Sequence, residues 1–266
     1  MALLYLERGS LPVQYGFRDG NQGTHTSRTV MIDDLRRLLA ATPATAVRAD
    51  YRRLIVEENI LGKRTIATRK LSATRLGEIY GLDTGVILFR ALRYFWDYDE
   101  AGKALLAGIC AHARDPLLRM TSPVVLPTPV GEVVTTQQLY DALSLATGDR
   151  FNANILHKIA RNASSSWEQT GHLVGRNTKT RHQATATPAT TAYALLLGYL
   201  TGMRGLRLFE TYWVSLLDAN HDTIDTMAFA ASRQGWLEYR RIGSVVDISF
   251  NMLLHTLGME AIREQD

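Results

Sequence analysis

Three kinds of side chain in the sequence could hold or transform a ligand: scattered histidines, a short acidic cluster and several runs of lysine and arginine. The seven histidines lie at positions 25, 112, 157, 172, 182, 221 and 255. No two have the three- or four-residue spacing that places a pair of metal ligands on one helix face. The single cysteine, Cys110, lies in an apolar helical run, where core packing is expected. The sequence therefore predicts no metal centre and no cofactor.

Two features could support catalysis, and each has a simpler structural explanation. Asp97, Asp99 and Glu100 could hold a divalent cation for phosphodiester cleavage, but a solvated helix start explains the same cluster. The serines at 164–166 offer hydroxyl nucleophiles, but they lie within an expected helix, without elbow glycines or an evident base. The chain also has no glycine-rich phosphate loop and no dinucleotide-binding fingerprint. We therefore expect a protein that is not an enzyme.

Basic residues concentrate in the segment 149–186, which holds six basic and two acidic side chains. A helix is expected at about 152–170, and its face opposite the apolar stripe carries Asn154, His157, Lys158, Arg161 and Ser165. A row of cations on one helix face neutralises several phosphates together, and counterion release then drives binding. The neighbouring polar groups can donate to phosphate oxygens or reach base edges. This face is the predicted DNA-binding surface, with an ordinary exposed helix face as the alternative.

A basic hairpin is expected directly after this helix. Residues 172–183 have the pattern of two short strands around an Asn-Thr-Lys turn, with three cations near the tip: Arg176, Lys179 and Arg181. A capped helix expected at about 135–147 precedes both elements. Helix, turn, helix and basic hairpin is the order of a winged helix. The sequence therefore predicts a winged-helix-like segment.

A second basic patch is expected at the opening of a helix over about 64–80. Its leading cations are Arg64, Arg69 and Lys70. Helix starts favour phosphate because their backbone N–H groups lack partners within the helix. This patch is a further predicted DNA contact.

The remaining periodicity predicts a mainly helical fold, a helical bundle with short β-hairpins. Further helices are expected before Pro43 and at about 46–60, 85–97, 101–114, 189–203, 206–217 and 222–234. A second hairpin is expected around Gly243 and Ser244. Apolar residues make up 46% and charged residues 21% of the chain, which is ordinary globular composition.

The positions of glycine and proline predict three regions. Residues 1–28 are expected to form an extended arm that packs on the body through Leu3, Leu4, Tyr5 and Tyr15. Residues 29–121 are expected to form an N-terminal helical bundle. Residues 122–266 are expected to form a C-terminal helical domain that contains the winged-helix-like hairpins.

Hydropathy and the N-terminal residues predict a cytoplasmic location. The longest strongly apolar window, Tyr193 to Leu200, is far shorter than the roughly 20 residues needed to cross a bilayer. The first residues contain no basic leader, no sustained apolar run and no small-residue cleavage site. We therefore expect no membrane association.

Two stretches, Glu57–Lys70 and Lys158–Leu173, resemble the BrxA family of bacterial BREX phage-defence systems. The likeness spans roughly residues 30–215. It implies a small helical protein, related in fold to the antitermination factor NusB, that binds double-stranded DNA and has no known catalytic site. The arm at 1–28 and the tail after about residue 218 lie outside the likeness.

These observations predict a non-enzymatic accessory protein of a phage-defence locus whose partners are double-stranded DNA and other BREX defence proteins. Two alternatives stay open. A protein-interaction scaffold would use its basic patches for acidic partner surfaces instead of DNA. A nuclease would use the acidic cluster at Asp97, Asp99 and Glu100.

Overall fold

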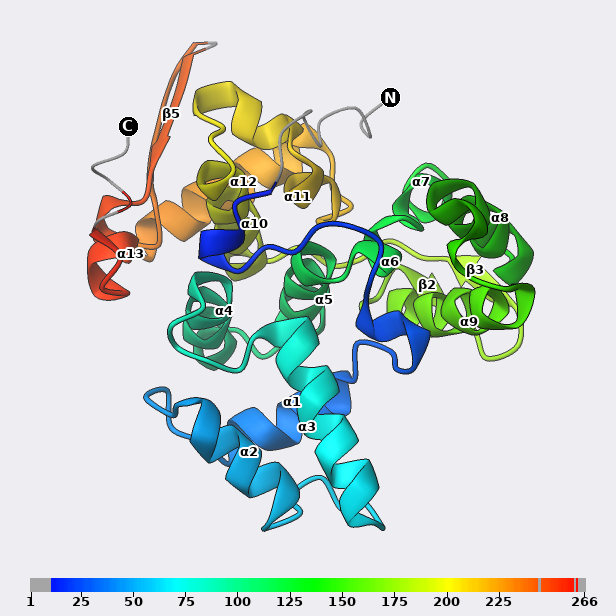
Figure 1. The fold of residues 1–266 in the computed structure, drawn as a ribbon. Coiled ribbons are helices and arrows are strands. Elements are labelled where there is room, and N and C mark those ends of the chain that lie inside the picture. The colour runs from blue at the N-terminus through cyan, green and yellow to red at the C-terminus, as the bar shows by residue number, and fades with distance from the viewer. Residues whose placement is uncertain (1–10, 244, 261, 263–266) are drawn as a thin grey trace.

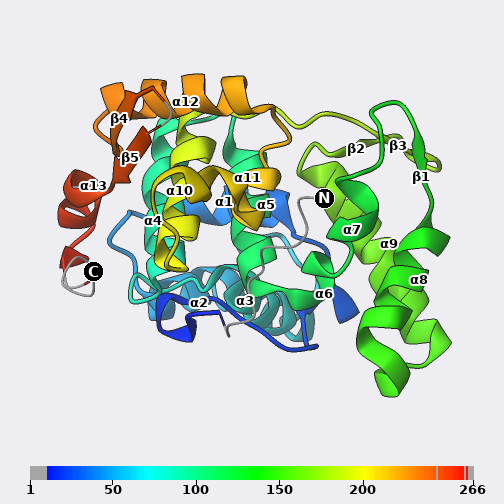
Figure 2. The ribbon, with the colours of Figure 1, turned by 90° about the horizontal axis from the view of Figure 1, so that it is seen from above.

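The structure is a computed structural model that describes residues 11–243, 245–260 and 262. It is mainly helical with two small antiparallel sheets, as the sequence predicts. Two almost wholly buried helices, α5 (Lys103–Arg114) and α10 (Pro188–Leu200), lie at its centre (Figures 1 and 2). Helices that are apolar on all sides are stable only inside a core. The other helices pack around this pair.

Local sequence explains where the central helices begin and how closely they pack. The Thr187 hydroxyl accepts from the backbone N–H of Thr190, and Pro188 occupies the first turn of α10. In α5, a Cβ at Gly108 would lie 2.6 Å from the Thr170 methyl group, so only glycine allows this approach. Cys110 is fully buried in α5, and burial raises the pKa of its thiol to about 11. Its expected place in the core is confirmed.

Most of the outer helices overlap the expected ranges, with ends that differ by up to four residues. They are α1 (Ile32–Ala40), α2 (Arg48–Val56), α3 (Ile66–Tyr80), α4 (Ile87–Tyr98), α12 (His221–Arg233) and α13 (Asn251–Thr256). The helix expected at 206–217 is instead two pieces, the 3-10 segment η5 (Gly205–Glu210) and α11 (Tyr212–Ser215). Thr211 between them has an extended backbone, which interrupts the helix. No helix was expected over α13.

The N-terminal segment is part of the core rather than a peripheral arm. It contains two 3-10 turns, η2 (Val13–Tyr15) and η3 (Thr24–Thr26). Phe17 and His25 are fully buried, and the backbone N–H of Arg18 donates to the Ala113 carbonyl at 3.0 Å. Tyr15 packs against the core as expected, whereas the contacts expected of Leu3, Leu4 and Tyr5 lie outside the described residues.

The part of the chain that includes the predicted winged-helix-like segment forms a lobe around α8 and α9 at one end of the molecule (Figures 1 and 2). Its elements are α6 (Pro116–Arg119), α7 (Ser122–Val125), β1 (Val133–Val134), α8 (Thr136–Thr147), the 3-10 turn η4 (Gly148–Arg150), α9 (Ala153–Gln169), β2 (Leu173–Val174) and β3 (Lys179–Arg181). The antiparallel sheet has the order β1-β3-β2. The two helices and the hairpin were expected, whereas the pairing of β1 with β3 was not.

The second expected hairpin is present at the other end of the molecule (Figure 2). It consists of β4 (Glu238–Ile242) paired antiparallel with β5 (Val245–Ser249). One cluster of buried apolar residues extends from Leu11 to Ile262, and α10 packs on both α4 and α5. A domain boundary near residue 121 stays a prediction. Within the described chain, none of the helices combines the length and apolar character needed to cross a bilayer.

Candidate nucleic-acid interface

Helix α9 presents the predicted DNA-binding face to solvent. The Asn152 side chain caps the helix by accepting from the backbone N–H of Ile155 at 3.0 Å. Its buried stripe, which includes Leu156, Ile159, Ala163 and Trp167, packs on the body. Because these apolar residues are buried, the opposite face of α9 is exposed to solvent.

The expected residues lie together on that face, at helical spacing. Asn154, His157, Lys158 and Arg161 are exposed, and Ser165 is half-buried. Neither Lys158 nor Arg161 forms an ion pair with any residue that the structure describes. The His157 ring stacks on Tyr140 of α8, with ring centroids 4.3 Å apart. We call these five residues the α9 stripe.

Of the three cations expected in the hairpin that follows α9, only Arg176 is both exposed and without an ion pair among the described residues. Arg176 is exposed in the turn between β2 and β3. Lys179 instead forms an ion pair with Glu168 and donates to the Gly175 carbonyl. Glu168 follows Arg161 by seven residues, so it lies at the end of the same helix face. The ion pair with Lys179 neutralises the charge of Glu168, which is the only acidic residue of α9.

The sequence placed Arg181 with the cations at the hairpin tip, and this placement is wrong. Arg181 is 2% exposed and forms a two-point ion pair with Asp218, with contacts of 2.6 and 2.8 Å. It also donates to the carbonyls of Val125 and His172. Lys179 and Arg181 share one face of β3 because side chains alternate along a strand. That face is turned toward the protein.

The second basic patch is separate from the α9 stripe. Arg64 and Lys70 are exposed, but Arg69 donates to the backbone carbonyls of Val56 and Lys63, both at 3.4 Å. Arg69 thus ties the end of α2 to the start of α3. Figure 1 places the α2–α3 connection at the lower end of the molecule, well away from the α8–α9 lobe. The two patches do not form one continuous surface.

Arg150 is a cation that the list of expected contacts omitted. It is exposed in η4, just before α9, and its guanidinium lies over the Phe151 ring, 5.2 Å from the centroid. Its sequence signal was its place in the basic segment 149–186. With Arg150, the exposed cations of the lobe extend from the start of α9 to Arg161.

Ser166 has a base beside it that sequence reasoning missed, because the base comes from the N-terminal segment. Its Oγ lies 2.7 Å from His25 Nε2, and His25 Nδ1 lies 2.7 Å from an oxygen of Asp115. We call these three residues the clasp. All three side chains are buried from solvent. The geometry resembles a serine-histidine-aspartate triad.

The hydrogen bonds of the clasp assign it a structural role. The Asn162 carbonyl can only accept, so the Ser166 hydroxyl donates its proton there, at 2.8 Å. Its oxygen then accepts from the backbone N–H of Val30 and from His25 Nε2. With both ring nitrogens donating, His25 cannot take the serine proton. The clasp fastens the N-terminal segment to α6 and α9.

The acidic cluster is also engaged in structure. Asp97 pairs with Arg93 and Glu100 pairs with Lys103, while Asp99 accepts from the backbone N–H of Gly102. No group of three histidine, cysteine, aspartate or glutamate side chains suited to a metal occurs in the parts of the chain that the structure describes.

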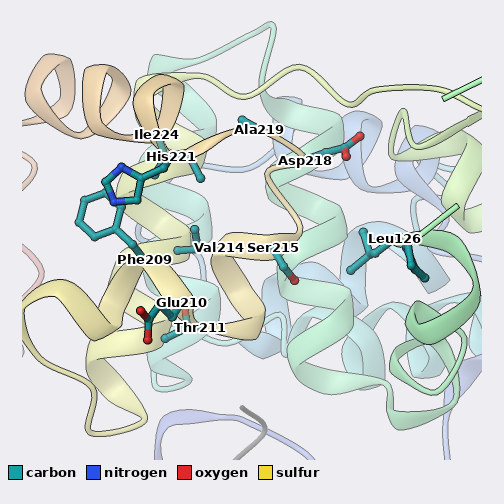
Figure 3. Close-up of a pocket in the computed structure, with 11 residues that line it drawn as sticks. Leu126, Phe209, Glu210, Thr211, Val214, Ser215, Asp218, Ala219, His221 and Ile224 are labelled. Atoms are coloured by element: carbon teal, nitrogen blue, oxygen red, sulfur yellow. The ribbon is translucent and has the colours of Figure 1, made fainter. Parts of the chain in front are cut away.

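An apolar cavity of about 450 Å³ lies between the end of α7 and the start of α12 (Figure 3). The rings of Phe209 and His221 stack at one side of it, with centroids 5.2 Å apart. Its lining includes the carboxylates of Glu210 and Asp218 and contains no lysine or arginine. This cavity therefore does not suit a phosphate.

Two buried imidazoles under the lobe make stability sensitive to acid. Burial lowers the pKa of His172 to about 4, and its Nε2 donates to the Leu216 carbonyl at 3.0 Å. Burial also lowers the pKa of His112 well below its ordinary value. Below pH of about 6.5 the unfolded chain binds protons that the folded chain does not. Stability is therefore retained near neutral pH and lost as the pH falls through this window.

We expect the free energy of unfolding to fall between pH of about 6.5 and 4, with His172 alone contributing on the order of 3 kcal/mol by the time the pH reaches 4. Urea unfolding at pH 7, 6 and 5 measures this slope. A His172→Gln variant should show a shallower slope, because one of the two groups no longer titrates. Equal slopes for the variant and the parent chain would contradict the assignment.

Comparison with known proteins adds no relative: no protein-family model matches the chain, and no curated protein matches its sequence.

Proposed function

We propose that this protein binds double-stranded DNA without catalysing a reaction. The observation that carries the proposal is the α9 stripe, whose cations Lys158 and Arg161 are exposed and unpaired among the described residues. The stripe lies on α9, which follows α8 after the 3-10 turn η4 and precedes the β2–β3 hairpin, and this is the element order of a winged helix. In such segments the second helix enters the major groove and the hairpin contacts the backbone alongside.

The stripe would supply phosphate contacts and a smaller number of base contacts. Lys158 and Arg161 neutralise phosphates, and Arg150 and Arg176 extend the cationic surface to both sides of the helix. Asn154 and His157 can reach base edges. Because most of these groups read phosphates, we propose weak sequence preference.

We further propose that the protein acts as an accessory component of a phage-defence system, together with other defence proteins. The likeness of Glu57–Lys70 and Lys158–Leu173 to the BrxA family supports this context. The second stretch coincides with most of α9 and thus with the proposed DNA-binding face.

Reversing the charge of the stripe tests the proposal. The Lys158→Glu/Arg161→Glu variant should bind a labelled duplex at least about tenfold more weakly, and its slope of log affinity against log salt should be shallower by about 1.8. Both side chains are exposed, so the fold should tolerate the change. Binding is measured by fluorescence anisotropy at several salt concentrations.

The matched control is Arg207→Glu/Arg233→Glu, which changes the net charge by the same amount at exposed positions outside the lobe. It should lower affinity only slightly and leave the slope unchanged. If both double variants weaken binding equally, the effect is one of net charge and the α9 stripe is not the interface. Unchanged duplex binding by the Lys158→Glu/Arg161→Glu variant would also show that the α9 stripe is not the interface.

A second candidate function is a protein-interaction scaffold, and one observation favours it. At the tip of the β4–β5 hairpin, Ile242 and Val245 are 82% and 68% exposed. Large apolar side chains at a protruding tip suit contact with a protein partner. If the purified chain does not bind duplex DNA but co-purifies with another defence protein, this function is favoured over DNA binding.

A further inference from the structure

A cavity of about 430 Å³ lies between α2, the end of α3, the start of α4 and the N-terminal segment. Four arginines line it: Arg18, Arg48, Arg52 and Arg114. The apolar part of its wall is formed by Tyr51, Ile55, Leu82 and Val86. Its volume falls within the range of small-molecule sites.

The two acidic groups in the cavity wall, Glu78 and Asp83, form no ion pair with these arginines among the described residues. The Glu78 carboxylate accepts from Arg75 at 2.7 Å and from the Thr24 hydroxyl at 3.3 Å. The Asp83 carboxylate accepts from the backbone N–H of Gly85 at 2.9 Å. None of the four lining arginines forms an ion pair within residues 11–243, 245–260 and 262. Four guanidinium groups against the two carboxylates of Glu78 and Asp83 leave the cavity wall with a net positive charge.

Two of the arginines are held in place by backbone carbonyls. Arg18 Nη1 and Arg114 Nε both donate to the Glu78 carbonyl, each at 3.3 Å, and Arg114 Nη1 donates to the Gly16 carbonyl. Arg114 is only 8% exposed. Burial lowers the pKa of its guanidinium, and the like charge of Arg18 acts in the same direction. A buried cation beside another cation is costly unless an anion joins them.

We infer that this cavity binds a small phosphorylated organic molecule. Guanidinium groups match phosphate oxygens with paired hydrogen bonds, and the fixed Arg18 and Arg114 offer donors at the inner end of the cavity. Arg48 and Arg52, exposed on α2, complete the ring of charge at the mouth. The apolar wall suits the organic part of the ligand.

This site is independent of the proposed DNA interface. A duplex cannot enter a cavity of this size, and Figure 1 places α2 at the far end of the molecule from the α8–α9 lobe. Arg48 and Arg52 are also distinct from the second basic patch at Arg64 and Lys70. The two proposals therefore succeed or fail separately.

Isothermal titration calorimetry tests the inference. The full chain is titrated with adenosine monophosphate, adenosine triphosphate and inorganic phosphate. We expect saturable binding of at least one nucleotide with a dissociation constant below about 1 mM, and tighter binding than inorganic phosphate. The Arg48→Ala/Arg52→Ala variant should bind at least about tenfold more weakly. Both arginines are exposed, so the variant should fold.

The matched control is Arg36→Ala/Arg37→Ala, which removes two exposed arginines of α1 outside the cavity. It should bind the nucleotide as the parent chain does. Absence of saturable binding at about 5 mM nucleotide, far above the expected constant, would overturn the inference. Nucleotide binding by the Arg48→Ala/Arg52→Ala variant equal to that of the parent chain would also overturn it.

Discussion

The Asp115→Asn substitution is expected to lower the free energy of unfolding by about 3–5 kcal/mol, because it removes the charge of a buried ion pair. Asp115 is fully buried and accepts four hydrogen bonds. Burial alone would raise its pKa, but the positive charge of His25 and the hydrogen bonds hold the pKa below its ordinary value. An amide cannot accept on both sides, so one set of donors would lose its partner.

Denaturant unfolding of Asp115→Asn and of Asp149→Asn measures this effect. Asp149 is an exposed carboxylate without an ion pair in the described chain, so its substitution should change stability by less than about 0.5 kcal/mol. Gly23→Ala should also destabilise the clasp, because its Cβ would lie 2.0 Å from an Asp115 oxygen. If Asp115→Asn stays within about 1 kcal/mol of the parent chain, the clasp does not fasten the N-terminal segment.

The helices could be predicted because their signals are local. The caps of α8 and α9, Thr135 and Asn152, are polar residues directly before an apolar period, and both accept from backbone N–H groups, as expected for Thr135. The α9 stripe follows from the same period, since the faces of a long amphipathic helix are set by residue spacing. Its exposed residues could therefore be identified before the fold was known.

Features that depend on distant pairing could not be predicted. Strand β1 has two residues and exists because Val133 and Val134 pair with Thr180 and Lys179 of β3. The clasp joins His25, Asp115 and Ser166, which are separated by 90 and 141 residues in sequence from the histidine. The N-terminal segment has no helical period, so nothing local showed that Phe17 and His25 are buried. Contacts across such separations require the tertiary fold.

The arginine cavity escaped prediction for a related reason. Arg18, Arg48 and Arg114 come from three separate elements, and none lies in a run of basic residues that would mark a binding surface. Cations that lie close together in sequence mark the lobe. The cavity has no such local signal, because packing gathers arginines that are isolated in sequence.

Replacing Asp218 with asparagine is the other substitution expected to cost about 3–5 kcal/mol, since it leaves the buried Arg181 without a counterion. Asp218 has a left-handed backbone, with φ of 55°, which asparagine tolerates well, so the change removes the charge and one acceptor oxygen without straining the backbone. Glu58→Gln is the control, because its pair with Arg53 is about half exposed and should contribute less than about 1 kcal/mol. Thermal or urea unfolding compares the two.

The same ion pair separates a structural role for Arg181 from the DNA contact that the sequence suggested. Arg181→Gln should destabilise the chain, yet at a temperature where it is folded its slope of log affinity against log salt should equal that of the parent chain. A phosphate contact would instead flatten the slope by about 0.9. Arg176→Gln should produce that flattening with little loss of stability, since Arg176 is exposed in the hairpin turn. If Arg181→Gln flattened the slope and Arg176→Gln did not, Arg181 would be a DNA contact after all. Only a side chain that reaches the duplex can release its counterions.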